Sequence, residues 1–163
     1  MPRRKRSDQL QPPCLSQVDL GRRLDTQHYE RHLIQAQRRL REVQLAYFRS
    51  QRRALVVLEG WDASGKGGII RRMAVLLDPR GFKVWPIAAP EPEEQGRHYL
   101  YRFWRRIPER GVIAVFDRSW YGRVLVERVE GLIERAEWIR AYREINDFER
   151  MLVDDGARIV KVF

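Results

Sequence analysis

The sequence ALVVLEGWDASGKGGIIRRM, residues 54–73, contains an apolar run, a glycine-rich loop and the start of an amphipathic pattern. The run at 54–59 is rich in β-branched residues, which is typical of a strand buried on both faces. Ile69, Met73 and Leu77 follow at helical spacing. In such a loop, glycines let backbone N–H groups curl around phosphate oxygens, and the N-terminus of the next helix adds its positive end. The order of strand, loop and helix therefore predicts a phosphate-binding P-loop.

The loop departs from the usual P-loop pattern at one position. Residues 60–66 satisfy G-x-x-x-x-G-K, and Lys66 is expected to reach the phosphates that undergo transfer. Gly67 stands where a Ser or Thr would normally hold magnesium. Another residue is therefore expected to hold the metal, and Asp62, inside the loop, is one candidate.

A second apolar run, GVIAVFD at 111–117, ends in a carboxylate, as a Walker-B strand does. Because ligands bind at the carboxyl edge of a parallel sheet, Asp117 and Lys66 are expected to face one crevice. Magnesium prefers a few carboxylate and phosphate oxygens together with waters. Asp62 and Asp117 are therefore predicted to hold Mg²⁺. Alternatively, Asp62 orients or deprotonates an acceptor phosphate.

Basic residues crowd the same region of the sequence. Arg118 directly follows Asp117 and is expected in the crevice, and arginine's planar fork suits bidentate phosphate binding. More arginines lie on the polar side of the helix expected at 100–107. For any one of these arginines, a solvated surface charge is the alternative. The predicted phosphate-binding set is Gly60, Ala63, Ser64, Gly65, Lys66, Gly67, Gly68, Arg71, Arg123 and Arg128.

Strand and helix patterns alternate along the chain, which predicts an α/β domain of the P-loop kinase type with three α/β/α layers around a parallel sheet. Residues 1–24 are expected to form a mobile basic tail, and residues 25–163 the domain. Because the chain stops on an expected strand, the domain is expected to be incomplete at its C-terminus. Strands are expected at 54–59, 83–88, 111–117 and 158–163, and helices at 26–47, 66–77, 100–107, 120–129 and 134–153.

Composition narrows the class of partner. Lys and Arg number 32 against 22 acids, a net charge of +10, which indicates a polyanionic partner or simply a basic surface. No apolar run approaches the ~20 residues of a membrane span. The single cysteine, Cys14, cannot form an internal disulfide, so a cytoplasmic location is expected. The long helix near the N-terminus is a candidate for subunit contact, and Arg3–Arg6 are expected to be solvated rather than to bind nucleic acid.

The motifs GWDASGKGG, PIAAPEPEE, RFWRRIPERG, FDRSWYGRVLVERVEG and INDFERML occur in this order between residues 60 and 152. Together they resemble the polyphosphate kinase 2 family, over about residues 24–163. The resemblance implies a magnesium-dependent kinase that moves the terminal phosphate between inorganic polyphosphate and a nucleotide. Gly67 is usual in that family. The catalytic residues that it implies are Asp62, Lys66, Asp117 and Arg118, with the surrounding arginines lining the path of the polymer.

Residues 18–33, VDLGRRLDTQHYERHL, resemble the linker and first helix of the second half of the tandem form of the family. That form favours AMP as acceptor, giving ADP, while conversion of ADP or GDP to the triphosphate stays open. Members of the family continue into a lid with further arginines, which is expected to be missing here. Two rival functions are an ATP-dependent nucleotide kinase and a non-catalytic polyanion-binding fragment.

Overall fold

The computed structural model of the chain describes residues 16, 19, 21 and 23–163. The expected tail at 1–24, with Arg3–Arg6 and Cys14, therefore lies almost wholly outside the described residues. In the part that is described, no helix combines the length and the apolar character that crossing a membrane requires.

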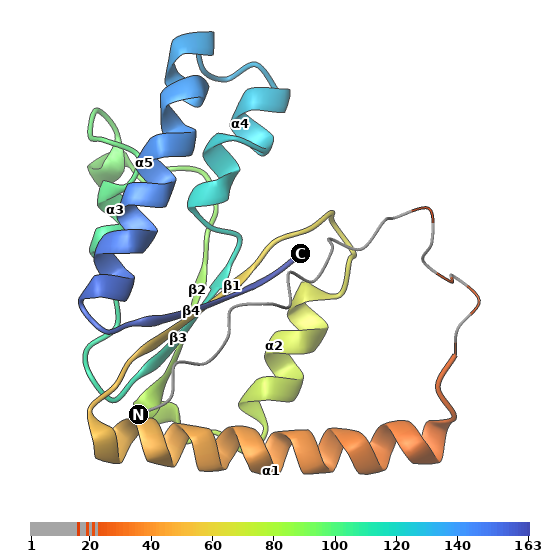
Figure 1. Ribbon diagram of the computed structural model, residues 1–163. Coiled ribbons are helices and arrows are strands. Elements are labelled where there is room, and N and C mark those ends of the chain that lie inside the picture. Colours follow the sequence, from red (N-terminus) through yellow and green to blue (C-terminus); the bar gives the residue numbers. More distant parts are fainter. Residues whose placement is uncertain (1–15, 17–18, 20, 22) are drawn as a thin grey trace, which may run out of the picture.

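The centre of the molecule is a parallel sheet of four strands, as the sequence predicts (Figure 1). The strands lie in the order β2-β3-β1-β4, and both central strands are almost wholly buried. α3 and α5 lie on one side of the sheet and α2 on the other (Figure 1). The strands are β1 (Ala54–Leu58), β2 (Phe82–Pro86), β3 (Ile113–Asp117) and β4 (Arg158–Val162).

The strand order places a crevice between β1 and β3. The connection from β1 to β2 passes over β3, and the connection from β3 to β4 passes over β1. The two neighbouring strands therefore send their chains in opposite directions, and in α/β sheets the carboxyl ends of such strands are where ligands bind. The register pairs Leu58 with Asp117 at this edge.

The core forms where α5 (Arg135–Asp154) packs against the sheet. Ala141, Ile145, Phe148 and Leu152 recur every three or four residues and are buried together against the side chains of β1 and β3. Trp120 fills the end of this core with its side chain fully buried. Large rings from three further elements meet it there, which fixes the chain immediately after Asp117. These rings are Phe103, Phe116 and Phe148.

Two predicted helices are shorter than expected. α3 covers only Tyr101–Trp104, and the N–H groups of Arg106 and Ile107 bond the carbonyls three residues earlier instead of four. The segment at 120–129 divides into a 3₁₀ turn, η4 (Trp120–Arg123), and α4 (Val126–Val129). Leu125, at φ −100° and ψ −84°, separates the two.

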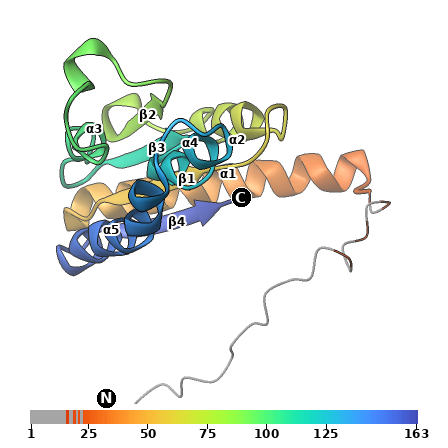
Figure 2. The ribbon, with the colours of Figure 1, turned by 90° about the horizontal axis from the view of Figure 1, so that it is seen from above.

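The long N-terminal helix α1 (Thr26–Ser50) lies across the base of the molecule (Figures 1 and 2). Its side-chain hydrogen bonds to the end of α2 (Lys66–Ala74), and to the residues that follow α2, come from polar residues. The amide of Gln44 is buried and bonds both the N–H and the carbonyl of Asp78 at 2.9 Å. Gln37 and Arg41 donate to the carbonyls of Arg72 and Leu76, each at 2.8 Å.

Apolar residues recur at helical spacing along α1, and this stripe is only partly covered. Val43 and Ala36 are exposed, and Leu33, Leu40 and Tyr47 are half-buried. The extent of the helix was therefore predictable, but its mode of contact with the domain was not.

Candidate active site

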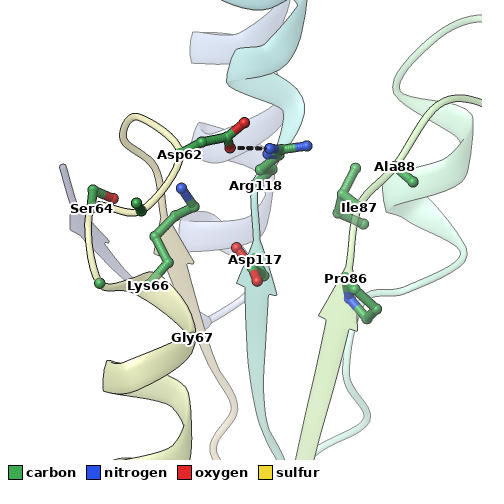
Figure 3. A pocket seen from close by; sticks show the side chains of 11 residues that line it. Asp62, Ser64, Lys66, Gly67, Pro86, Ile87, Ala88, Asp117 and Arg118 are labelled. Carbon is green, nitrogen blue, oxygen red and sulfur yellow. Dashed lines mark hydrogen bonds and ion pairs between the residues drawn. The ribbon is translucent and has the colours of Figure 1, made fainter.

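A pocket of about 490 Å³ opens at the carboxyl edge of β1, β3 and β2. One wall is the glycine-rich loop at 62–67, the floor is Asp117 at the end of β3 with Arg118 above it, and the opposite wall follows β2 (Figure 3). That opposite wall is apolar and consists of Pro86, Ile87 and Ala88. The backbone N–H of Ile87 donates to the carbonyl of Asp117 at 2.9 Å, which attaches this wall to the floor.

The glycine-rich loop has the backbone that an anion cradle needs. Gly60 (φ 137°), Ala63 (φ 63°) and Gly65 (φ 98°) turn the chain through positive φ before α2 begins at Lys66. A Cβ on Gly60 would meet the hydroxyl oxygen of Ser64 at 2.9 Å, so the close turn requires glycine there. The first N–H groups of α2 have no acceptor within the helix, and the residues that begin it, Lys66 and Gly67, line the pocket, which suits a phosphate oxygen.

Lys66 is bound to its own loop. Its ammonium group donates to the carbonyls of Gly60 and Trp61, at 2.8 Å each. Both acceptors belong to the loop's backbone, so the amine is held at the pocket by groups that a phosphate oxygen can replace.

Gly67 is not required by packing. A Cβ at this position would meet no atom within 4 Å, and Gly67 lines the pocket. A Ser or Thr side chain could therefore be accommodated by the protein, and the space beside Gly67 belongs to the pocket.

The four residues predicted to be catalytic lie around one pocket: Asp62, Lys66, Asp117 and Arg118. Arg118 donates from Nη2 to Oδ1 of Asp62 at 2.5 Å (Figure 3). Asp62 is thus paired with the arginine across the pocket mouth. Asp117 lies below, at the strand end. Two carboxylates beside a phosphate cradle match the oxygen ligands that Mg²⁺ prefers, with phosphate and water completing its shell.

Behind the pocket, Glu59 and Ser119 form a contact that sequence reasoning missed. Both are buried, and the hydroxyl of Ser119 donates to Oε1 of Glu59 at 2.6 Å. Burial raises the pKa of Glu59 even though the bond from Ser119 lowers it. The signal in the sequence was a carboxylate that directly continues the buried run of β1.

Five of the predicted phosphate ligands lie outside the pocket lining: Gly60 and Gly68, at the two ends of the loop, and three arginines. Arg71 is exposed on α2. Arg123 binds Glu127 at 2.6 Å and Glu137 at 2.7 Å. Arg128 is exposed; it donates to the Tyr142 hydroxyl at 2.8 Å and lies 4.2 Å from the centre of the Trp138 ring.

Two arginines of the segment expected as a helix at 100–107, Arg102 and Arg106, have a buried ionic partner. Glu94 is almost wholly buried and pairs with Arg106 at 2.7 Å and Arg102 at 3.1 Å. Arg102 also donates to the carbonyl of Ala88 at 3.0 Å, so this cluster supports the apolar wall of the pocket.

The two tryptophans that flank the phosphate motifs differ in exposure. Trp120 is fully buried in the core, which leaves it no face for a ligand. Trp61 is 90% exposed at the tip of the loop. Of the two, only Trp61 can stack on a nucleotide base.

The family and the relatives that this chain matches agree with one another. Residues 23–163 match the family described as polyphosphate kinase 2. The chain is 53% identical over 148 residues to a polyphosphate:AMP phosphotransferase of Pseudomonas syringae, covering 90% of this chain and 30% of that protein. It is 42% identical over 127 residues to an AMP/ADP-polyphosphate phosphotransferase of Meiothermus ruber, covering 77% of this chain and 48% of the relative.

A solved structure agrees with these relatives. A crystal structure of a polyphosphate kinase 2 from Pseudomonas aeruginosa matches with a TM-score of 0.85 and 51% identity, covering 90% of this chain and 32% of that chain. The present chain spans about 30% of the length of the first curated relatives that it matches. On the fold, the motifs and these matches together, the chain belongs to the polyphosphate kinase 2 family.

Proposed function

We propose that this chain carries the phosphoryl-transfer site of a polyphosphate:nucleotide phosphotransferase. The observation that carries the proposal is the convergence of Asp62, Lys66, Asp117 and Arg118 on one pocket beside the phosphate cradle. The family and the names of the relatives support the same reaction class.

In the proposed reaction, the loop at 60–68 holds the terminal phosphate of inorganic polyphosphate. An oxygen of the acceptor phosphate attacks its phosphorus in line, the bond to the bridging oxygen breaks, and the electron pair stays on the shortened polyphosphate. Lys66 leaves its two carbonyl partners and neutralises the phosphate oxygens as charge shifts to the leaving group. Catalysis then rests on positioning and charge neutralisation.

Asp62 and Asp117 are proposed to hold Mg²⁺, which when bound supplies positive charge to the transferring and leaving oxygens. Arg118 is proposed to bind the transferring phosphate through the guanidinium edge that now contacts Asp62. Arg71, Arg123 and Arg128 are proposed to contact the polymer beyond the pocket, Arg123 by exchanging one of its carboxylate partners.

AMP is the proposed acceptor. Two relatives named for polyphosphate:AMP phosphotransfer are 50% identical or more over about 90% of this chain, whereas one named for ADP is 36% identical. A single domain at 25–163 and a cytoplasmic location stay predictions of the sequence.

The test is transfer by the purified chain with long-chain polyphosphate and magnesium, supplied separately with AMP and with ADP. We expect ADP from AMP, and loss of the product in Lys66→Ala. The matched control is Lys83→Ala, because Lys83 forms only a surface pair with Glu109 at 3.1 Å, remote from the pocket lining. ATP formed only from ADP would refute AMP as acceptor.

Two further outcomes correspond to the rival functions. A preference for ATP as donor would indicate an ordinary nucleotide kinase. Polyphosphate binding that weakens steeply with salt, without transfer, would indicate a polyanion-binding protein.

A further inference from the structure

Two buried side chains, Glu59 and Ser119, link the start of the glycine-rich loop to the end of β3 behind the pocket. Glu59 continues β1 and precedes Gly60, while Ser119 follows Arg118 at the end of β3. Glu59 is 7% exposed and Ser119 is 3% exposed. The Ser119 hydroxyl donates to Oε1 of Glu59 at 2.6 Å, across 60 residues of sequence. A hydroxyl-to-carboxylate bond of this length is in the strong, charge-assisted class.

Arg118 directly precedes Ser119 and has a backbone conformation that is unfavourable for its residue type. Its φ of 66° is left-handed, which crowds the Cβ of any residue other than glycine. Such conformations persist only where the surroundings hold them. Here the backbone N–H of Arg118 donates to the carbonyl of Leu58 at 3.0 Å, and the next residue is Ser119, held by Glu59.

The Ser119 hydroxyl also serves the chain that follows. It accepts a hydrogen bond from the N–H of Tyr121 at 3.2 Å and caps η4. The single hydroxyl therefore bonds both Glu59 and the start of the next element. The guanidinium of Arg118, by contrast, is about half exposed, and its partner Asp62 is more exposed still. A surface pair of this kind holds geometry weakly.

We propose that Glu59 is a positioning residue: through Ser119 it holds Arg118 in the left-handed turn that directs the guanidinium into the pocket. Glu59 does not itself line the pocket, so it acts through another residue and not on the substrate. The kinetic part of this inference rests on the proposed function. The conformational part does not.

The variants separate the hydrogen bond from packing and from charge. Glu59→Gln keeps an acceptor for Ser119, Glu59→Leu keeps similar volume without an acceptor, and Ser119→Ala removes the donor. Ser50→Ala is the matched control, because the Ser50 hydroxyl bonds only the carbonyl of Ala46 within α1. Thermal unfolding of every variant shows which ones are folded at the assay temperature.

The first readout is amide hydrogen exchange at Arg118, which needs no catalysis. We expect exchange to accelerate by about tenfold or more in Glu59→Leu and Ser119→Ala, in line with the loss of a partner from a buried hydrogen bond. Exchange in Glu59→Gln should stay within about threefold of the wild type. Unchanged exchange in folded Glu59→Leu and Ser119→Ala overturns the proposal.

The second readout is the kcat and KM of transfer. We expect kcat to fall by about tenfold in Glu59→Leu and in Ser119→Ala, with KM for polyphosphate changed by less than about twofold, because the bond holds a reacting geometry. The double variant should be no slower than either single variant, since both remove one interaction. Additive losses, or full kcat in folded Glu59→Leu, contradict the proposal. If the wild type shows no transfer while exchange behaves as expected, the proposed function fails and the positioning pair stands.

Discussion

Arg118 and Asp62 form an ion pair across the mouth of the pocket, with Nη2 and Oδ1 2.5 Å apart and 56 residues between them in sequence. Two of the four residues proposed to be catalytic therefore neutralise each other in the free protein. The pair is exposed, and exposed pairs contribute little to stability. A bound phosphate and its cation can consequently take the place of each partner at small cost.

Asp62→Asn is expected to lower kcat by about a hundredfold and to raise the magnesium concentration needed for half-maximal rate, because a proposed metal ligand loses its charge. The thermal midpoint should not change, since the side chain is solvent-exposed. The measurement is the initial rate across a magnesium titration. If kcat falls while the magnesium dependence is unchanged, Asp62 acts on the acceptor phosphate and not on the metal.

Gly65→Ala and Gly67→Ala should have opposite consequences. Gly65→Ala should lower the free energy of unfolding by about 1–2 kcal/mol, because Gly65 has a φ of 98° and a Cβ is unfavourable in left-handed backbone. Gly67→Ala should be as stable as the wild type, because its Cβ meets no atom within 4 Å, yet it should raise KM for polyphosphate by crowding the pocket. Urea unfolding and steady-state kinetics of the two variants test this. An unchanged KM in Gly67→Ala would show that the phosphate lies elsewhere.

The stability of Glu59→Gln relative to the wild type should depend on pH. Burial raises the pKa of Glu59 above its ordinary value of 4.5. The folded state then binds this proton more tightly than the unfolded state, so ionisation costs stability as pH rises from about 4.5 through the folded value. The neutral glutamine avoids this cost.

The free energy of unfolding of Glu59→Gln minus that of the wild type should therefore increase between about pH 4 and pH 8 and level off above the folded pKa. Urea unfolding across this range measures it. A difference that falls with rising pH would mean that the hydrogen bond from Ser119 outweighs burial.

Glu94→Ala is expected to destabilise the protein by about 3–5 kcal/mol, because Arg102 and Arg106 would keep their charges without a buried partner. Glu93→Ala is the neighbouring control. Its side chain is 79% exposed and pairs with Arg105 at 3.7 Å, so the loss should stay within about 0.5 kcal/mol. Chemical denaturation of both variants gives the comparison, and equal losses would refute the structural role assigned to Glu94.

Arg71→Ala and Arg128→Ala should each raise KM for long-chain polyphosphate by about 1.5- to 5-fold and leave kcat unchanged, as loss of an exposed charge contact predicts. Tripolyphosphate, which we expect to stay within the pocket because of its shortness, should show no change. Arg49→Ala provides the control, since α1 ends at the opposite edge of the sheet. A matching rise with tripolyphosphate would place these arginines at the reacting phosphate.

Local pattern was enough to predict the sheet and most of the pocket. The buried runs that end at Glu59 and Asp117 predicted two parallel strands whose carboxyl ends face one crevice, and the glycines at 60 and 65 predicted the loop between strand and helix. These features depend on residues close together in the chain, where periodicity and turn chemistry are informative. The strand order confirmed that both motifs reach one crevice.

The partners of charged residues could not be predicted in the same way. Arg123 looked like a phosphate ligand, but α5 brings Glu137 to it, and that contact depends on how the two elements pack. The pairing of Asp62 with Arg118 depends on left-handed backbone at both Ala63 and Arg118, which their residue types do not signal. Side-chain pairing of this kind is a property of tertiary structure.

The attachment of α1 to α2 has a consequence for how the two helices can vary. Gln37, Arg41 and Gln44 donate to the carbonyls of Arg72, Leu76 and Asp78, and a carbonyl is present whatever side chain a residue carries. These three hydrogen bonds therefore depend on side chains of α1 alone, whereas one further contact, from Arg72 to the Tyr29 hydroxyl at 2.6 Å, needs a side chain from each helix. Substitutions on α2 other than at Arg72 should leave the junction intact, whereas α1 must retain three donors at fixed spacing, so mutational tolerance should be greater on α2 than on α1.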